Sequence, residues 1–329
     1  MRYALRWFLV CAALLVCSGL QAQTRSIGTA AAYPVKSVRV IVPYTPGGIT
    51  DVVTRIVALE LAKNFGQPFI VDNRPGANSM LGIELLAKAS PDGYTLGTVI
   101  AAHAANQTLY PKLPYDSIKS FEQVSLLATA PLIVCATNSL AAKSVKELVE
   151  LAKAKPGQLT FASSGIGAAA HLTTELLMST TGIKMVHVPY KGTAPALQDL
   201  IGGQVTVMMD TPSSMLPHVR AGRIKALGMA SEKRVAVAPE IPTLIEGGVP
   251  VVGGTWVGLL APGGTPRPVV ERLAREVAAA IHKPEINERF VQLGIEPVGN
   301  TPAEFTQFLK DEVAKWAKVI RDANVKIDG

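Results

Sequence analysis

Short apolar runs alternate with helical patterns along most of the chain, and this alternation restricts the fold more than any other feature of the sequence. The run at 38–43 is expected to be a buried strand, and the apolar spacing over 50–64 predicts the helix that follows it. The same order returns later, with a strand at 159–162 and a helix at 168–180. Strands and helices alternating at this spacing favour parallel sheets with right-handed crossovers. We therefore expect an α/β fold.

Length and pattern together predict two lobes. About 300 residues remain after the N-terminal leader, which suffices for one large or two ordinary domains. We expect each lobe to be a mainly parallel sheet flanked by helices, with two hinge crossings near 129–131 and 253–256. The first domain would comprise residues 33–129 and 254–329, and the second would comprise residues 130–253.

The N-terminus has the pattern of a secretory signal. Arg2 and Arg6 precede an apolar run over 7–20, and small and polar residues follow this run. This run is shorter than the roughly 20 apolar residues that a membrane-spanning helix needs. We therefore predict a signal peptide over 1–22, cleaved after Ala22, and a secreted mature protein.

Cysteine content and charge argue against a disulfide-stabilised protein and against a nucleic-acid-binding protein. Only Cys135 remains once the predicted signal is removed, so the mature chain has no internal disulfide and relies on its apolar core. The formal net charge of +7 is scattered, without a basic run or interleaved aromatic residues. Nucleic acid is therefore not an expected partner, whereas an anionic ligand suits the mildly basic balance.

Small residues gather in loops between a strand and the next helix. The clearest such loops are 46–51, 75–79, 163–167, 191–194 and 210–214. Each would leave backbone N–H groups free at a helix N-terminus, where the helix dipole favours negative charge. In open α/β sheets, ligands bind where such loops share the carboxyl edge of the strands. The loops therefore predict a cleft that holds an anion with neutral donors.

Two enzyme classes compete with this interpretation. The segment from Gly165 to Ala170 fits a dinucleotide-binding pattern, but the next strand ends at 188–191 without the acidic residue that would bind the ribose. A secreted α/β hydrolase would use Ser163 or Ser164, yet no G-x-S-x-G motif frames either serine. We therefore expect no enzymatic activity.

No metal or cofactor is expected either. The five histidines are isolated, without a His-x-x-x-His pair or a cysteine partner. Asp51 and Asp210 each open a helix, and we expect Asp51 to act as a cap. For Asp210, capping and contact with an amine or hydroxyl group of a ligand both stay open.

Ordered motifs along essentially the whole mature chain carry a resemblance to a known family. They include YPVK at 33–36, VIVPYTPGG at 40–48, VDNRPGA at 71–77, PDGYTL at 91–96, FASSG at 161–165, VHVPYKG at 186–192, DLIGGQ at 199–204 and APGGTP at 261–266. The chain resembles the Bug or TctC-like family, the periplasmic solute receptors of tripartite tricarboxylate transporters.

This resemblance implies a two-lobed periplasmic-binding-protein (Venus flytrap) fold without catalytic function. The expected ligand is a small carboxylate, such as a di- or tricarboxylate, an amino acid or an aromatic acid. The expected partners are the large and small integral membrane subunits of a transporter, and we expect a monomer in the periplasm. A sensor subunit that presents its ligand to a membrane kinase stays open as an alternative, as does the secreted hydrolase.

The resemblance also implies ligand contacts from both lobes. The first lobe supplies Tyr44, Gly47, Gly48, Asp51, Ser79, Ala101 and His103. The second lobe supplies Ser163, Ser164, Gly167, His171, Tyr190, Lys191, Gly192 and Asp210.

Some positions depart from the common family pattern. Ile49 stands where a third glycine is frequent, the turn at 78–80 has fewer glycines, and residues 101–102 are alanines where serines or threonines are frequent. These changes predict a bulkier and more apolar pocket in the first lobe. We therefore expect a monocarboxylate with an apolar or aromatic body rather than a citrate-like polyanion.

Overall fold

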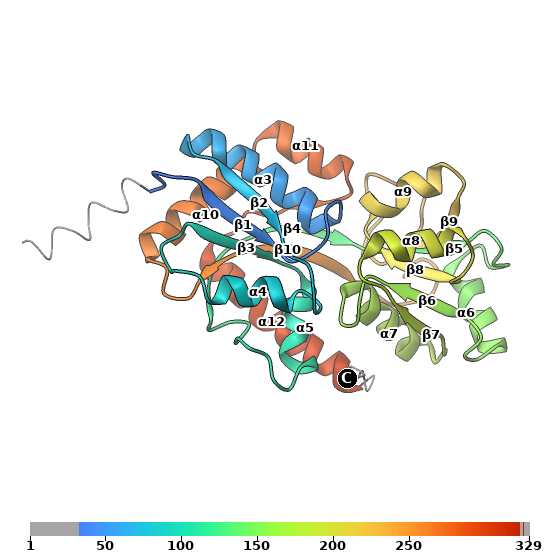
Figure 1. Ribbon diagram of the computed structural model, residues 1–329. Helices are drawn as coiled ribbons and strands as arrows, with labels where there is room; N and C mark the ends of the chain where they lie inside the picture. The colour runs from blue at the N-terminus through green and yellow to red at the C-terminus, as the bar shows by residue number, and fades with distance from the viewer. Residues whose placement is uncertain (1–32, 323–324, 326–329) are drawn as a thin grey trace, which may run out of the picture.

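The computed structural model describes residues 33–322 and residue 325. Figure 1 shows two α/β lobes lying side by side, each built around its own sheet. The signal peptide predicted for residues 1–22 lies outside the described residues. Among the helices that are described, none is long and apolar enough to cross a membrane.

Six strands form the sheet of the first lobe within the described residues, in the order β11-β4-β10-β3-β1-β2. The apolar residues of the inner strands are buried nearly throughout, as in β1, because helices cover both faces. The strands are β1 (Val38–Val42), β2 (Phe69–Asn73), β3 (Thr95–Val99), β4 (Phe121–Pro131), β10 (Gly254–Pro262) and β11 (Glu296–Pro297).

Helices from both ends of the chain cover this sheet. One face carries α3 (Ile49–Phe65), α10 (Arg267–Ile281) and α11 (Pro284–Gln292), whose apolar residues share one core cluster. The other face carries α4 (Met80–Ala87), α5 (Ala101–Leu109) and α12 (Pro302–Asp322). The C-terminal helices therefore return to the first lobe, as Figure 1 shows.

The second lobe contains a five-stranded sheet in the described residues, in the order β7-β6-β8-β5-β9. Its strands are β5 (Ile133–Thr137), β6 (Thr160–Ser163), β7 (Val186–Pro189), β8 (Val207–Asp210) and β9 (Ile224–Met229). Helices again cover both faces, with α8 (Thr193–Ile201) and α9 (Pro212–Arg220) on one, and α6 (Val145–Ala154) and α7 (Ala169–Thr181) on the other.

Strand direction differs from the prediction of mainly parallel sheets. In the first lobe, β1 pairs in parallel with β2 and β3, but β10 runs antiparallel to β3 and β4. In the second lobe, β6 runs parallel to β7 and β8, whereas β5 runs antiparallel to β8 and β9. Both sheets are therefore mixed, because β5 and β10, the strands that the chain enters after each crossing, run opposite to both of their neighbours.

The chain crosses between the lobes twice. It leaves the first sheet at the end of β4 and enters the second at β5, and it returns between β9 and β10. Backbone bonds tie the two crossings together: Leu132 N–H donates to Gly253, Gly253 N–H to Ala230 and Ala230 N–H to Leu132, at 3.2, 3.0 and 2.7 Å. The domain limits at 129/130 and 253/254 stay a prediction, and these crossings lie next to them.

Candidate functional site

A cavity of about 270 Å³ lies between the two lobes. The first lobe contributes the loop 44–50 and Ile100, and the second contributes Ser164 and segments 168–170 and 192–194, with residues around the end of β8. Leu132 and Thr255, from the two crossings, complete the lining. The cavity therefore depends on residues of both lobes and of the segments that join them.

Five helix N-termini meet at this cavity within the described part of the chain. The N-cap residues of α3, α5, α7, α8 and α9 all line it, and none of their side chains accepts a hydrogen bond from a backbone N–H of its own helix. The N-terminal N–H groups of a helix carry partial positive charge and bind anions. The N-caps are Gly48, Ile100, Ala168, Gly192 and Thr211.

Two hydroxyl groups of the lining have no hydrogen-bond partner. These are the Tyr44 and Thr255 hydroxyls, both buried, and the whole Thr255 residue is only 6% exposed. Burial raises the pKa of Tyr44 well above its usual range, so the phenol keeps its proton and remains a donor. Because an unpaired buried polar atom is costly, the Thr255 hydroxyl is a candidate for contact with a ligand. The Tyr44 hydroxyl instead faces Ser79 and Tyr110, which do not line the cavity.

Asp210 is the ionisable carboxyl group on the cavity wall. It ends β8, and burial raises its pKa above the usual range of aspartate, although donors from Thr211 and Thr193 oppose that shift. Capping is one of the two roles that the sequence leaves open for Asp210, and in the structure Asp210 precedes the N-cap Thr211 and accepts the Thr211 N–H at 2.7 Å. Among the described residues, no lysine or arginine lines the cavity.

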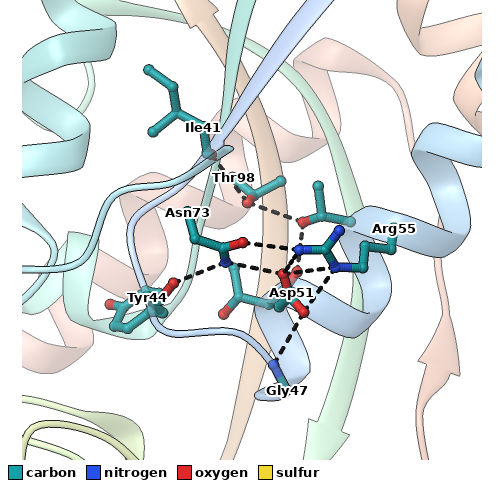
Figure 2. A network of polar contacts seen from close by, with 9 residues as sticks. Ile41, Tyr44, Gly47, Asp51, Arg55, Asn73 and Thr98 are labelled. Atoms are coloured by element: carbon teal, nitrogen blue, oxygen red, sulfur yellow. Dashed lines mark hydrogen bonds and ion pairs between the residues drawn. The ribbon is translucent and has the colours of Figure 1, made fainter. Parts of the chain in front are cut away.

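The cavity loop 44–48 is held in place by Asp51 (Figure 2). Its carboxylate accepts the Gly47 N–H at 3.0 Å and hydrogen bonds from Asn73 and Arg55, also at 3.0 Å. Asn73 in turn donates to the Tyr44 carbonyl oxygen at 3.0 Å. Burial acts to raise the pKa of Asp51, but these hydrogen bonds outweigh it and lower the pKa, so the carboxylate stays charged. Asp51 therefore positions the loop and does not line the cavity itself.

Three further residues predicted for the first-lobe site lie outside the lining. Ala101 and His103 are buried in α5, and His103 Nε2 is 2.8 Å from the Ser117 carbonyl oxygen. Ser79 is the N-cap of α4, in the left-handed conformation with φ of 73°, and its hydroxyl is buried without a partner. These residues lie behind the cavity wall rather than on it.

In the second lobe, three predicted residues shape the 163–167 loop from within. The Ser163 hydroxyl donates to the Gly165 carbonyl at 3.0 Å and lies 2.6 Å from His187 Nε2. His171 accepts the Gly167 N–H at 3.0 Å and stacks on His187, with ring centroids 3.9 Å apart. Burial and the neighbouring His171 lower the pKa of His187 to about 3, so the stacked pair does not share two positive charges near neutral pH.

The Ser163–His187 contact does not form a hydrolytic centre. Ser163 is 0% exposed, so a substrate cannot reach its hydroxyl oxygen. Among the described residues, no group of three or more histidine, cysteine, aspartate or glutamate side chains is arranged to hold a metal ion.

Two other predicted residues lie beside the cavity. The Tyr190 hydroxyl donates to Asp199 at 2.5 Å, and Lys191 is exposed. Six predicted residues do line the cavity, three from each lobe. They are Tyr44, Gly47, Gly48, Ser164, Gly192 and Asp210.

Some lining residues have no distinctive signal in the sequence. Ile100, Leu132 and Leu197 are apolar residues like many others in the chain, and Thr255 lies in a strand that we did not predict. Thr193, Thr211 and Ser214 belong to small-residue loops that the sequence does indicate. The hydroxyl side chains of these three residues, in loops that follow strands, are the signal by which the residues could have been predicted.

A larger hollow of about 720 Å³ lies against the crossing segments. Its lining includes the charged residues Lys233, Arg234, Glu312 and Lys315. No helix N-cap among the described residues lines it. The smaller cavity is therefore the better candidate for an anion site.

Two α/β lobes joined by two crossings, with a cavity between them that five helix N-termini line, have the architecture of a solute-binding protein. The sequence model of the tripartite tricarboxylate transporter family receptor, TctC, matches residues 53–325. The chain belongs to this family, as its motifs predicted. Within it, the described fold is that of the periplasmic binding proteins of the Bug and TctC type.

Relatives match the chain over most of its length. BugT of Bordetella pertussis is 36% identical over 90% of this chain and 91% of its own. The MatC structure from Rhodopseudomonas palustris with bound malate is 35% identical, covers 88% of this chain and 100% of that one, and has a TM-score of 0.81. The R. palustris Rpa4515 structure with adipate is 34% identical, covers 89% and 99%, and has a TM-score of 0.86.

These findings confirm the predicted family and the two-lobed α/β fold. The chain is a solute-binding receptor of the TctC and Bug family, whose members are periplasmic binding proteins. The family and its structural neighbours are receptors and not enzymes, as the sequence predicted.

Proposed function

We propose that this receptor captures a small carboxylate in the periplasm and delivers it to the integral membrane subunits of a tripartite transporter. One observation carries the proposal: five helix N-termini meet at a cavity that no described lysine or arginine lines. Such a site holds an anion with backbone N–H groups and hydroxyls rather than with cationic side chains. Adipate and malate in the two similar structures support a carboxylate as the anion.

Contacts across the cleft support capture by closure of the lobes. A Cβ atom on Gly167 would lie 2.3 Å from Leu109 Cδ1 of the first lobe, and one on Gly192 would lie 3.3 Å from Thr45 Oγ1. The lobes therefore approach closely on either side of the cavity. A ligand that contacts both lobes stabilises the closed arrangement over an open one, which is the condition for ligand-driven closure.

The ligand-contact role of the predicted residues forms part of this proposal. Tyr44, Gly47, Gly48, Ser164 and Gly192 would contact the carboxylate or its carbon chain directly. Asp51 and His171 would act by holding the loops in position, through their hydrogen bonds with residues 47 and 167. Export through residues 1–22 and delivery to large and small membrane subunits are further parts of the proposal.

A thermal-shift screen of the mature chain, from residue 24 onward, against a library of carboxylic acids tests this function. A ligand that binds only the folded state raises apparent stability by roughly 2.7 kcal/mol at a hundredfold excess over its Kd. We expect a raised Tm with one chemical group of acids. A flat response from folded, ligand-free protein across the whole library contradicts the proposal.

A sensor that presents its ligand to a membrane kinase would bind the same acids. Uptake of the bound acid into vesicles that contain the membrane subunits separates the two roles. Transport is expected to require this receptor, and uptake that is independent of it would favour the sensor.

A further inference from the structure

The turn at 77–79 has a backbone conformation that its residues disfavour. Ala77, Asn78 and Ser79 have φ of 45°, 49° and 73°, and in the described part of the chain they are the only residues other than glycine with a positive φ. This left-handed conformation crowds the Cβ atom against the following carbonyl oxygen, so residues with a side chain adopt it singly rather than in succession. Three in a row need a local cause, and strain of this kind is typical of sites that a protein uses.

Helix α5 holds the turn in this conformation. Asn106, which is 0% exposed, donates from Nδ2 to the Asn78 carbonyl oxygen at 2.9 Å. Its Oδ1 accepts a hydrogen bond from Asn78 Nδ2 at 2.8 Å. The Met80 N–H donates to the Ala77 carbonyl oxygen at 3.0 Å and closes the turn. The pair of carboxamides therefore fixes both the backbone and the side chain of Asn78, because each can donate and accept.

The side chain of Asn78 lies against the second lobe. A Cβ atom on Gly165 would lie 3.6 Å from Asn78 Oδ1, and one on Gly167 would lie 3.4 Å from Asn78 Nδ2. Leu109, three residues after Asn106 on α5, faces the same loop and comes within 2.3 Å of the Cβ position of Gly167. The absence of a side chain at the two glycines therefore lets the first lobe approach the 163–167 loop this closely.

The loop that Asn78 contacts is the one that presents Ser164 to the cavity. Ser164 lines the cavity, whereas no residue of the 77–79 turn does. Asn78 therefore contacts the second lobe without contacting the ligand. Because this contact joins the two lobes, opening of the cleft would break it. It stabilises the closed arrangement and leaves the open one unaffected, which is the differential effect that shifts such an equilibrium.

We infer that Asn78 is a clamp across the cleft: the strained turn directs its side chain onto the 163–167 loop, which holds Ser164 in position over the ligand. Asn78 is thus a positioning residue, because it acts on the ligand through another residue. Asparagine suits this place because it is among the residues that adopt the left-handed conformation most readily. The inference rests on the proposed function, since it takes closure on a carboxylate as the event that brings the lobes together.

Titration calorimetry with adipate, malate and hexanoate tests the clamp. Asn78→Gly removes the carboxamide and suits a positive φ, so the Kd of whichever acid the wild type binds most tightly should rise about tenfold. Dissociation of that acid, followed by stopped flow, should quicken accordingly. Asn138→Gly is the matched control, because its side chain donates to the Gly222 carbonyl oxygen within the second lobe. Its Kd should be that of the wild type.

Two further variants separate the side chain from the strain. Asn78→Ala removes the same carboxamide but keeps a Cβ atom at a positive φ, so it should lose the same affinity as Asn78→Gly and melt at a lower temperature. Ala77→Gly relaxes the turn and should raise the Tm by roughly 2 °C. An affinity loss in Asn78→Ala that Asn78→Gly does not share would overturn the clamp, because strain alone would then set the affinity. A Tm that Ala77→Gly leaves unchanged contradicts a strained turn.

A double variant shows whether the contact crosses the cleft. Gly167→Ala obstructs approach to the same loop, so Asn78→Gly should weaken binding less in that background than in the wild type. Additive effects would place the role of Asn78 within the first lobe and overturn the inference.

The outcomes also separate the clamp from the function beneath it. Equal Kd values for Asn78→Gly and the wild type overturn the clamp while carboxylate capture stands. If folded wild-type protein binds none of the three acids, the clamp fails together with the proposed capture of such acids. Melting curves establish that each variant is folded.

Discussion

Asp51 and Gly47 are joined by a hydrogen bond of 3.0 Å from the Gly47 N–H to the Asp51 carboxylate, which fixes the cavity loop to the first turn of α3. The same carboxylate binds Arg55 and Asn73. The charged Asp51 carboxylate thus lies buried behind the loop 44–48, whose neutral groups line the cavity.

Replacing Asp51 is therefore expected to weaken ligand binding without removing a ligand contact. Asp51→Ala leaves the Gly47 N–H and Asn73 without their acceptor, and we expect the Kd of the bound acid to rise about tenfold because the loop loses its fixed position. Titration calorimetry measures this change. Asp72→Asn, at an ion pair on the β2 edge, is the control. Equal affinities of Asp51→Ala and wild type would show that Asp51 does not position the loop.

Ser164 is half-buried on the second-lobe wall of the cavity. Ser164→Ala removes a hydroxyl donor, and we expect it to reduce the free energy of ligand binding by about 1–3 kcal/mol. Ser179→Ala should have no such effect, because Ser179 is exposed and its hydroxyl bonds to Leu176 within α7. Unchanged affinity in Ser164→Ala would mean that the second-lobe half of the site is misplaced.

Gly167 tests closure of the lobes. Its φ is 77°, and a Cβ atom there would lie 2.3 Å from Leu109 Cδ1 across the cleft. Gly167→Ala should lower both stability and ligand affinity, because it strains the backbone and obstructs approach of the lobes. Gly157→Ala is the matched control, with a φ of 71° and open space around the added methyl group.

The two glycine variants separate backbone strain from obstruction. Both should lose about 1 kcal/mol or more of unfolding free energy, measured by denaturant unfolding. Only Gly167→Ala should also bind the acid more weakly. If Gly157→Ala lost as much affinity, the effect would come from strain and not from contact between the lobes.

His103 makes stability depend on pH. Burial lowers its pKa to about 4, although its bond to the Ser117 carbonyl opposes that shift, whereas an unfolded histidine titrates near 6.5. Between these two pKa values the unfolded state therefore binds more protons than the folded state. The contribution of His103 to the stability of the folded state is complete above pH 6.5 and is lost as the pH falls towards 4. The loss for this one residue amounts to about 3 kcal/mol.

Unfolding free energies measured from pH 7 to 4 check this prediction. His103→Gln should reduce the slope with pH, whatever its effect on stability at pH 7. His282→Gln changes an exposed histidine and should leave the slope as in the wild type. A slope unchanged in His103→Gln would mean that the acid sensitivity arises elsewhere.

Local features of the fold were predictable because they depend on neighbouring residues. The sequence Ser144-Val-Lys-Glu147 is an example, because it has the pattern of a capping box: the Glu147 N–H donates to the Ser144 hydroxyl at 3.2 Å, and α6 begins at Val145. Four of the five small-residue loops contribute to one cavity because they follow strands that end at the same edge of each sheet. The fifth, 75–79, does not line it.

Long-range features could not be read in the same way. The antiparallel pairing of β10 with β4 joins residues more than a hundred positions apart, and nothing local in either strand specifies the direction. Ser163 and Ser164 show the same limit at the site. One hydroxyl turns inward to Gly165 while its neighbour lines the cavity, and only the tertiary packing of His187 and Phe161 decides which.

The most direct test of the account compares the best-binding acid with its primary amide in titration calorimetry of the mature chain. The two ligands have nearly the same shape and differ in the negative charge that helix N-termini stabilise. We predict saturable binding of the acid and at least tenfold weaker binding of the amide. Equal affinity for the two ligands would contradict a cavity built to hold a carboxylate.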